Sequence, residues 1–146
     1  MSKYIVTGYA GFIGYHLTKR LLEEGHEVVG IDNFNSYYTP ALKLYRRKML
    51  EEWEISGQLK LEDIDICYPY NYEHTMASCD AIYHLAAIPG VRKSFENPEM
   101  YVENNVTGSI NVLKAAGEYG VGKVILASSS SVYGDSASSG SLMKFQ

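Results

Sequence analysis

The sequence predicts an α/β protein whose core is a Rossmann-like, doubly wound parallel sheet of about five strands. Two observations predict this fold: short apolar segments alternate with helical patterns along the chain, and a glycine-rich turn follows the first strand. Strands that alternate with helices are joined by right-handed crossovers, so the strands run parallel and helices cover both faces of the sheet. Because the glycine turn follows the first strand, we expect the strand order 3-2-1-4-5.

The expected elements follow in chain order. Five apolar segments are the expected strands, at residues 3–7, 27–32, 58–64, 80–86 and 123–128. Helical patterns lie between them at 12–24, 38–53, 69–78 and 98–119, of which the third is weak. In the last of these helices, four side chains form one apolar stripe: Val102, Val106, Ile110 and Leu113. Glycines at 25, 57, 120 and 122 are typical of helix ends and turns.

The first strand ends in three glycines, Gly8, Gly11 and Gly14, spaced three residues apart. Gly8 can adopt the backbone angles of a tight turn, and Gly11 lets the backbone approach a ligand. Gly14 lets the following helix pack closely on the strand, and the start of that helix offers free amides and a partial positive charge. This order of strand, turn and helix is typical of a site for a diphosphate.

Asp32 ends the second strand, about 20 residues after the glycine turn. Its carboxylate can accept both hydroxyls of an adenosine ribose, and it would repel a 2′-phosphate. The sequence therefore predicts a dinucleotide site that favours NAD. A glycine turn that merely links strand to helix is the alternative, and Asp32 argues against it.

Length and composition limit the other possibilities. The length of 146 residues predicts one domain. The net charge of −4 disfavours nucleic acid as a main partner. It contains no long apolar run and no export leader, so we expect a cytoplasmic protein with no membrane span. The basic cluster Arg46-Arg47-Lys48 precedes Glu51 and Glu52 at helical spacing and is interpreted as a solvated helix face with ion pairs. Cys67, Cys79 and the histidines lack metal-ligand spacing, so no metal site is predicted.

Several further segments share one pattern. These are Glu62-Asp63-Ile64-Asp65, His84-Leu85-Ala86-Ala87, Gly90-Val91-Arg92-Lys93-Ser94, Asn97-Pro98, Asn104-Asn105-Val106-Thr107-Gly108 and Ala127 to Gly134. Together with the glycine turn and the stretch from Asp32 to Tyr38, they resemble the extended short-chain dehydrogenase/reductase family over residues 2–134. Within that family they are similar to the NAD-dependent nucleotide-sugar epimerases and dehydratases, and most of all to UDP-glucuronate 4-epimerases.

The resemblance implies roles for individual residues. The implied cofactor-binding residues are Gly8, Gly11, Phe12, Ile13 and Gly14 at the pyrophosphate, Asp32 with its neighbour Asn33 at the ribose, Asp63 and Ile64 at the adenine edge, and Leu85, Ala86, Ala87 and Asn104 on the nicotinamide side. Tyr9 stands where the family often has a small residue, and we expect its side chain to point to solvent. Ser129 matches the family's catalytic serine or threonine, whose hydroxyl would bond the sugar 4-OH and share in proton transfer. A polar strand end is the alternative interpretation of Ser128 to Ser131.

In the family, a tyrosine and a lysine four residues later, on the helix after the fifth strand, do the acid–base work. Residues 135–146 contain no tyrosine and are interpreted as a flexible tail, so we expect an incomplete NAD-binding domain at 1–134, truncated before the substrate domain. Two Tyr-x-x-x-Lys strings, at residues 15–19 and 119–123, are coincidences of spacing.

Two functions remain open. The chain is either the NAD-binding portion of a nucleotide-sugar epimerase, without turnover alone, or a stand-alone dinucleotide-binding module. A Tyr-x-x-x-Lys helix encoded downstream of codon 146 would favour the first. We expect NAD as the cofactor and a UDP-sugar as a partner of full-length relatives. We also expect a homo-oligomer, because the fifth strand, at residues 123–128, would be an uncovered apolar edge, and such an edge recruits partners.

Overall fold

A computed structural model describes residues 1–129 and residue 132. In this part of the chain, five parallel strands form one sheet: β1 (Lys3–Thr7), β2 (Glu27–Asp32), β3 (Leu59–Asp63), β4 (Ala81–His84) and β5 (Val124–Leu126). Their order is β3-β2-β1-β4-β5, which confirms the predicted fold class and strand order. Val6 is in register with Gly30 of β2 and with Tyr83 of β4, so β1 lies at the centre of the sheet.

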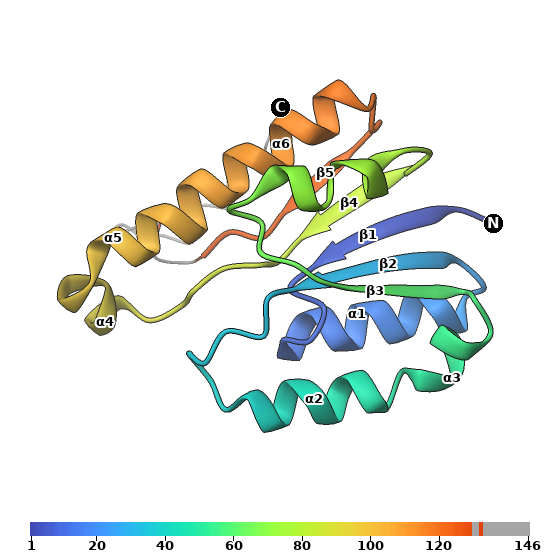
Figure 1. Ribbon diagram of the computed structural model, residues 1–146, viewed down its shortest axis with the longest axis horizontal. Coiled ribbons are helices and arrows are strands. Elements are labelled where there is room, and N and C mark those ends of the chain that lie inside the picture. The colour runs from blue at the N-terminus through green and yellow to red at the C-terminus, as the bar shows by residue number, and fades with distance from the viewer. Residues whose placement is uncertain (130–131, 133–146) are drawn as a thin grey trace, which may run out of the picture.

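Helices cover both faces of the sheet (Figure 1). On one face lie α1 (Phe12–Glu23), α2 (Pro40–Lys48) and α3 (Glu51–Ile55), and on the other lies α6 (Gly108–Glu118). The chain reaches α6 through α4 (Val91–Glu96), α5 (Pro98–Tyr101) and a π-helical segment, η3 (Val102–Thr107). Figure 1 shows α4 and α5 beyond the carboxyl ends of the strands, next to the segment that follows β4.

Each face of the sheet has its own apolar core, because successive strand residues point to opposite faces. The α1-face core contains Val6, Tyr9, Ala10, Leu21, Leu22, Val28, Leu50 and Leu59. The α6-face core contains Ile5, Val29, Ile31, Ile66, Tyr72, Met76, Cys79, Ile82, Val112, Ala115 and Ala116. These two cores hold the ends of β1, β2 and β4 in fixed relative positions.

Two predicted helices differ from the structure. The helix expected at 38–53 begins at Pro40 and is interrupted at Leu50, whose non-helical backbone sends a fully buried side chain into the α1-face core. The weak helix expected at 69–78 is instead two short 3₁₀ turns, η1 (Pro69–Asn71) and η2 (Glu73–Met76). There the Thr75 hydroxyl donates to the Tyr72 carbonyl at 2.7 Å, a local bond of the kind that competes with helix formation.

Tyr9 does not point to solvent, so that expectation is wrong. Its side chain is fully buried, and a Cβ on Gly30 would lie 2.8 Å from Tyr9 Cγ. The absence of a side chain on Gly30 therefore makes room for the ring. Among the described residues, the Tyr9 hydroxyl has no hydrogen-bond partner, and burial raises the pKa of Tyr9 above its ordinary range.

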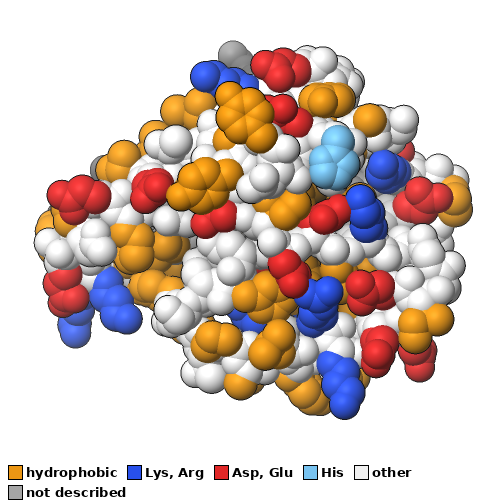
Figure 2. All heavy atoms as spheres, viewed as in Figure 1, with side chains coloured by type: hydrophobic (Ala, Val, Ile, Leu, Met, Phe, Trp, Pro, Cys, Tyr) orange, Lys and Arg blue, Asp and Glu red, His pale blue; other side chains and the backbone are white. Residues whose placement is uncertain are grey.

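The apolar stripe of the last helix lies on its exposed side. Its four residues are between 45% and 55% exposed, whereas α6 packs on the sheet through Gly108, Val112, Ala115 and Ala116. On the edge strand β5, Ile125 and Leu126 are also exposed. The face shown in Figure 2 mixes acidic, basic and apolar side chains without one dominant charge. Within the described residues, no helix has the length and apolar character needed to cross a membrane. The expected tail at 135–146 lies outside the described residues.

Candidate cofactor site

A cavity of about 680 Å³ opens at the carboxyl ends of β1, β2 and β4. In doubly wound sheets this edge binds ligands where the strand order reverses, which here is between β1 and β4. The cavity brings together every predicted cofactor residue except Asp63, namely Gly8, Gly11, Phe12, Ile13, Gly14, Asp32, Asn33, Ile64, Leu85, Ala86, Ala87 and Asn104. Their roles toward a cofactor remain predictions.

The glycine turn forms a cradle at the start of α1. Gly8 has a φ of 74°, and its amide donates to the Ile31 carbonyl of β2 at 2.7 Å. The Gly8 carbonyl accepts the Gly11 amide at 3.0 Å, which closes the turn. A Cβ on Gly14 would lie only 2.1 Å from the Gly8 oxygen, so α1 begins in direct contact with the turn. Because the first turn of a helix leaves amides without intrahelical partners, this cradle fits a diphosphate.

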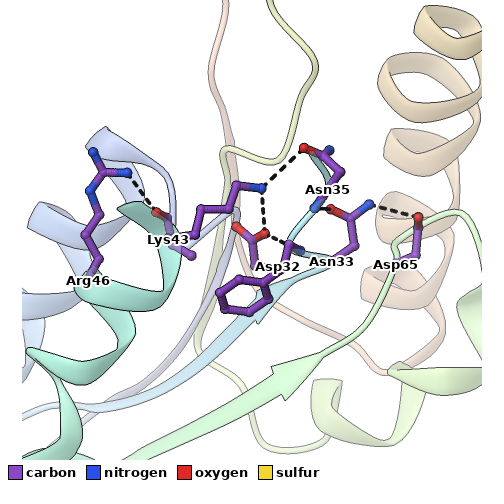
Figure 3. A network of polar contacts seen from close by, with 8 residues as sticks. Asp32, Asn33, Asn35, Lys43, Arg46 and Asp65 are labelled. Atoms are coloured by element: carbon purple, nitrogen blue, oxygen red, sulfur yellow. Dashed lines mark hydrogen bonds and ion pairs between the residues drawn. The ribbon is translucent and has the colours of Figure 1, made fainter. Parts of the chain in front are cut away.

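Asp32 lies at the end of β2 in a network of polar contacts (Figure 3). Its Oδ1 accepts the Phe34 amide at 2.8 Å and Lys43 Nζ at 3.0 Å. The Lys43 ammonium also donates to Asn35 Oδ1 at 3.3 Å. Only 6% of the Asp32 side chain and 11% of the Lys43 side chain are exposed. No described residue bonds to Asp32 Oδ2, which leaves that oxygen for the hydroxyls of a ribose.

Asn33 and Asp65 fix the segment that follows β2. Asn33 Nδ2 donates to Asp65 Oδ2 at 2.9 Å, and Asn33 Oδ1 accepts the Asn35 amide at 3.1 Å. Burial raises the pKa of Asp65, but hydrogen bonds from Cys67 and Asn33 outweigh it, so this pKa lies below its ordinary value. Asp65 therefore stays ionised and anchors Asn33 at the cavity wall.

Asp63 lies outside the cavity. Arg47 Nη1 donates to both oxygens of its carboxylate, at 2.5 and 2.6 Å, and 57% of the Asp63 side chain is exposed. Ile64, the next residue, lines the cavity. The adenine-edge role of Asp63 stays a prediction, and the ion pair with Arg47 would have to open for it.

A buried chain of hydrogen bonds supports the end of β4. The Thr7 hydroxyl accepts the amides of Leu85 and Ala86, both at 3.1 Å, so its proton goes to His84 Nδ1 at 2.7 Å. His84 Nε2 then donates to Ser109 Oγ at 2.9 Å. Burial lowers the pKa of His84, which keeps the ring neutral. The chain of bonds fixes the backbone of Leu85 and Ala86, which lines the cavity.

Helix α2 contributes cations that the sequence analysis missed. Lys43 and Arg46 line the cavity, and Arg46 Nη1 donates to the Ala10 carbonyl of the glycine turn at 3.0 Å. Arg47 pairs with Asp63 and with Glu54 rather than with the glutamates at 51 and 52. The interpretation of residues 46–48 as a solvated face with ion pairs is therefore wrong for Arg46, which lines the cavity, whereas Arg47 does form ion pairs but with other acidic residues. The three-residue spacing of Lys43 and Arg46, which places them on one helix face, was the available signal.

Comparison with known proteins identifies the family. The NAD dependent epimerase/dehydratase family matches residues 4–144. The chain belongs to this family. It is 44% identical over 138 residues to the UDP-glucuronate 4-epimerase of Thermodesulfobacterium geofontis and 42% identical over 132 residues to UDP-glucuronate 4-epimerase 4 of Arabidopsis thaliana. It also superimposes, with a TM-score of 0.80 and 37% identity, on UDP-glucuronic acid 4-epimerase from Bacillus cereus in complex with UDP-glucuronic acid and NAD.

These matches cover most of this chain and a smaller part of its relatives. They span 91%, 89% and 90% of the chain, but 41%, 30% and 41% of the three epimerases. The chain thus spans about 40% of the length of the Thermodesulfobacterium geofontis and Bacillus cereus epimerases. The resemblance to this family that the sequence motifs indicated is confirmed.

The residue predicted to be catalytic and the two Tyr-x-x-x-Lys tyrosines do not line the cavity. Ala127 lines the cavity, whereas Ser129 is exposed and is not one of the lining residues, so its catalytic role stays a prediction. Tyr15 and Tyr119, which begin the two Tyr-x-x-x-Lys strings, do not line the cavity either. Among the described residues, no group of three or more histidine, cysteine or acidic side chains could hold a metal ion.

Proposed function

We propose that this chain is the NAD-binding portion of a nucleotide-sugar epimerase of the UDP-glucuronate 4-epimerase type. The observation that carries the proposal is the cavity in which the glycine cradle and Asp32 lie together at the switch point of the sheet. The cradle would hold the pyrophosphate and Asp32 Oδ2 the adenosine ribose, with the backbone from Leu85 to Ala87 beside the nicotinamide. The Bacillus cereus relative, which contains both UDP-glucuronic acid and NAD, supports this assignment.

We further propose that the chain alone binds NAD without turnover. When bound, NAD supplies a hydride acceptor, and the residues described here bind and orient it. Epimerisation also needs a group that takes a proton from the sugar hydroxyl. In the described part of the chain, no tyrosine with a lysine four residues later lines the cavity. Ser129 would then assist a base that these residues do not supply.

Calorimetric titration with NAD⁺ and NADP⁺ tests the binding. We expect selective binding of NAD⁺, and Asp32→Ala should weaken it by about 1–3 kcal/mol, because charge-assisted hydrogen bonds to the ribose are lost. Glu118→Ala, at an exposed position at the end of α6, is the matched control and should leave the affinity unchanged. If neither dinucleotide binds, or if Asp32→Ala has no effect, the proposed site is wrong.

Turnover is tested separately. The chain is incubated with NAD⁺ and UDP-glucuronate, and the sugar nucleotides are separated by chromatography. We expect no 4-epimer above the level of a sample without protein. Formation of the epimer would show that the chain carries its own base and would refute the second part of the proposal while leaving the first intact.

A further inference from the structure

We propose that Tyr37, Gly90 and Tyr101 form a strap across the cavity, which must open each time a dinucleotide enters or leaves. The strap joins the turn after β2 to the segment after β4, and these two strands lie on opposite sides of β1. The proposal rests on the proposed binding of NAD, and it assigns the rate of cofactor exchange to contacts within the protein.

The two segments that the strap joins line the same cavity. Tyr37 and Thr39 line it from the turn after β2, and Ala87 and Pro89 line it from the segment after β4. The glycine cradle, which follows β1, lies between these segments. A dinucleotide with its ribose at Asp32 and its nicotinamide beside Ala87 would therefore cross from one segment to the other. A contact between the segments would enclose the middle of the cofactor against the cradle.

Tyr37 reaches across to Gly90. A Cβ on Gly90 would overlap the Tyr37 hydroxyl oxygen, so the two segments touch only because position 90 has no side chain. Gly90 also has a φ of 102°, a conformation that favours glycine. On the same side, Lys93 Nζ lies 4.6 Å from the centre of the Tyr37 ring, within the range of a cation–π contact. The Tyr37 ring is thus held against the segment after β4.

Tyr101, on α5, completes the strap from outside the cavity. Its hydroxyl lies 2.8 Å from the Pro89 carbonyl oxygen and 2.9 Å from that of Gly90. The Tyr37 hydroxyl lies 3.4 Å from the Tyr101 hydroxyl. Because a phenol has one proton, Tyr101 donates to the carbonyls and accepts from Tyr37, in a bond that is weak at this length. Tyr101 is not one of the residues that line the cavity, so it would act on a cofactor through the strap.

The segment after β4 is fixed more firmly than the turn after β2. Asn105 Oδ1 accepts the Ile88 amide at 2.8 Å, and Asn105 Nδ2 donates to the Ile88 carbonyl at 2.9 Å. The start of the same segment is bonded to Thr7. Among the described residues, by contrast, the Tyr37 hydroxyl bonds only to Tyr101. The strap should therefore open by movement of Tyr37 away from the segment after β4.

The first test compares Tyr101→Phe with Tyr70→Phe. Each substitution removes one phenolic hydroxyl, but the Tyr70 side chain is 88% exposed and does not line the cavity. Stopped-flow fluorescence of NADH gives the association rate constant on mixing with the protein. Displacement of bound NADH by excess NAD⁺ gives the dissociation rate constant, and thermal unfolding confirms that each variant is folded.

We expect both rate constants of Tyr101→Phe to rise about fivefold, the effect of one hydrogen bond, while their ratio changes by less than about twofold. They rise together because an open strap admits and releases the dinucleotide alike. Tyr70→Phe should match the wild type. Unchanged rates in Tyr101→Phe, equal changes in the two variants, or a rise in the dissociation rate constant alone would overturn the inference. A wild type that binds neither NADH nor NAD⁺ overturns the proposed function instead.

A second pair of variants opens the strap without removing a hydroxyl. In Gly90→Ala, the added Cβ would displace the Tyr37 hydroxyl, which is the far end of a side chain that can turn away. Gly25 also has a positive φ, 83°, but nothing lies within 4 Å of its added Cβ, so Gly25→Ala carries the backbone strain alone. We expect Gly90→Ala to raise both rate constants several-fold and Gly25→Ala to raise neither. Equal rates in these two variants overturn the inference.

Discussion

The two faces of the sheet are packed in different ways. On the α1 face, glycines allow close contacts with the backbone. A Cβ on Gly14 would collide with the Gly8 backbone, and the ring of Tyr9 packs directly on Gly30. On the α6 face, α6 buries Val112 and small residues but leaves its apolar stripe exposed. The closest approach to backbone atoms is at Gly14 in the glycine turn, whereas on the α6 face a Cβ on Gly108 would meet the flexible side chain of Ile66. Precise geometry for a ligand is thus built on the α1 face, and the α6 face should tolerate change better.

Substituting glycines on the two faces should give the largest contrast. Gly14→Ala puts a Cβ 2.1 Å from the Gly8 oxygen and 2.8 Å from the Tyr9 Cα, and neither backbone atom can move without deforming the cradle. We expect the free energy of unfolding to fall by about 3 kcal/mol, as for severe overpacking, and NAD⁺ binding to be lost. Urea denaturation and calorimetry measure the two effects.

Gly117→Ala, at an exposed position of α6, is the control for adding a methyl group where nothing is in contact. Nothing lies within 4 Å of the added Cβ, and alanine favours the helix over glycine. We expect a gain of about 0.5–1 kcal/mol with unchanged NAD⁺ affinity. Equal effects of the two substitutions would mean that contact with the Gly8 backbone is not the cause of the Gly14→Ala effect.

His84 joins the centre of the sheet to α6, and acid should weaken this connection. Burial lowers the pKa of His84 in the folded protein, so the unfolded chain binds the proton first. The stability contributed by the neutral ring is complete above the unfolded pKa, near 6.5, and is lost as the pH falls from there toward the folded pKa. The expected slope is at most about 1.4 kcal/mol per pH unit.

Urea denaturation between pH 5 and 8 (about the range in which histidine titrates) measures this slope. His84→Gln should reduce the slope below pH 6.5, at the unfolded pKa. His74→Gln, at an exposed position, should leave it as in the wild type. If His84→Gln also keeps the wild-type slope, another group is responsible for the acid sensitivity.

The part of the site that local sequence determines could be predicted. Gly8 and Gly14 are informative because a positive φ and a close backbone contact require glycine, and Asp32 is informative because its distance from the turn is typical of a dinucleotide site. Lys43 and Tyr9 could not be placed in this way, since each depends on a residue distant in sequence. Lys43 is identified only when α2 lies beside Asp32, and Tyr9 is buried only because Gly30 on β2 leaves room for its ring.

The apolar stripe shows a second limit of sequence patterns. Periodicity found the stripe from Val102 to Leu113 but did not say which side of the helix meets the sheet. In the structure, small residues such as Gly108 and Ala115 allow close approach, and a Cβ on Gly108 would lie 2.7 Å from Ile66 Cδ1. The side of α6 that packs on the sheet is decided by steric fit to the residues opposite, and the sequence of the helix alone does not contain that information.

Two buried tyrosines, one in each core, should respond oppositely to loss of the hydroxyl. No residue in the described part of the chain bonds to the Tyr9 hydroxyl, so Tyr9→Phe removes an unsatisfied buried group and should stabilise the protein by about 1 kcal/mol. The Tyr72 hydroxyl donates to the Ile66 carbonyl at 3.0 Å, so Tyr72→Phe should destabilise it by about 1 kcal/mol. Thermal unfolding of both variants checks the signs. A loss of stability in Tyr9→Phe would mean that its hydroxyl finds a partner in solution.

The exposed apolar residues of β5 and of the stripe from Val102 to Leu113 should affect assembly more than the free energy of unfolding. We expect the wild type to sediment as a dimer or larger species at about tens of micromolar, because an exposed apolar strand edge pairs with other chains. Leu126→Lys puts a charge on the edge strand β5, where the side chain is 55% exposed, and should yield monomer. Because the site is exposed, the free energy of unfolding should change by less than about 0.5 kcal/mol.

Two further lysine substitutions locate the contact on this surface. Leu113→Lys tests the stripe, where the side chain is 46% exposed, and Glu118→Lys adds a lysine at an exposed polar position of the same helix. If copies of the chain meet through the strand edge, only Leu126→Lys dissociates them. If they meet through α6, Leu113→Lys does so instead, and Glu118→Lys should do neither. A wild type that is monomeric without aggregation would refute assembly through either surface, since the prediction rests on burial of this apolar area.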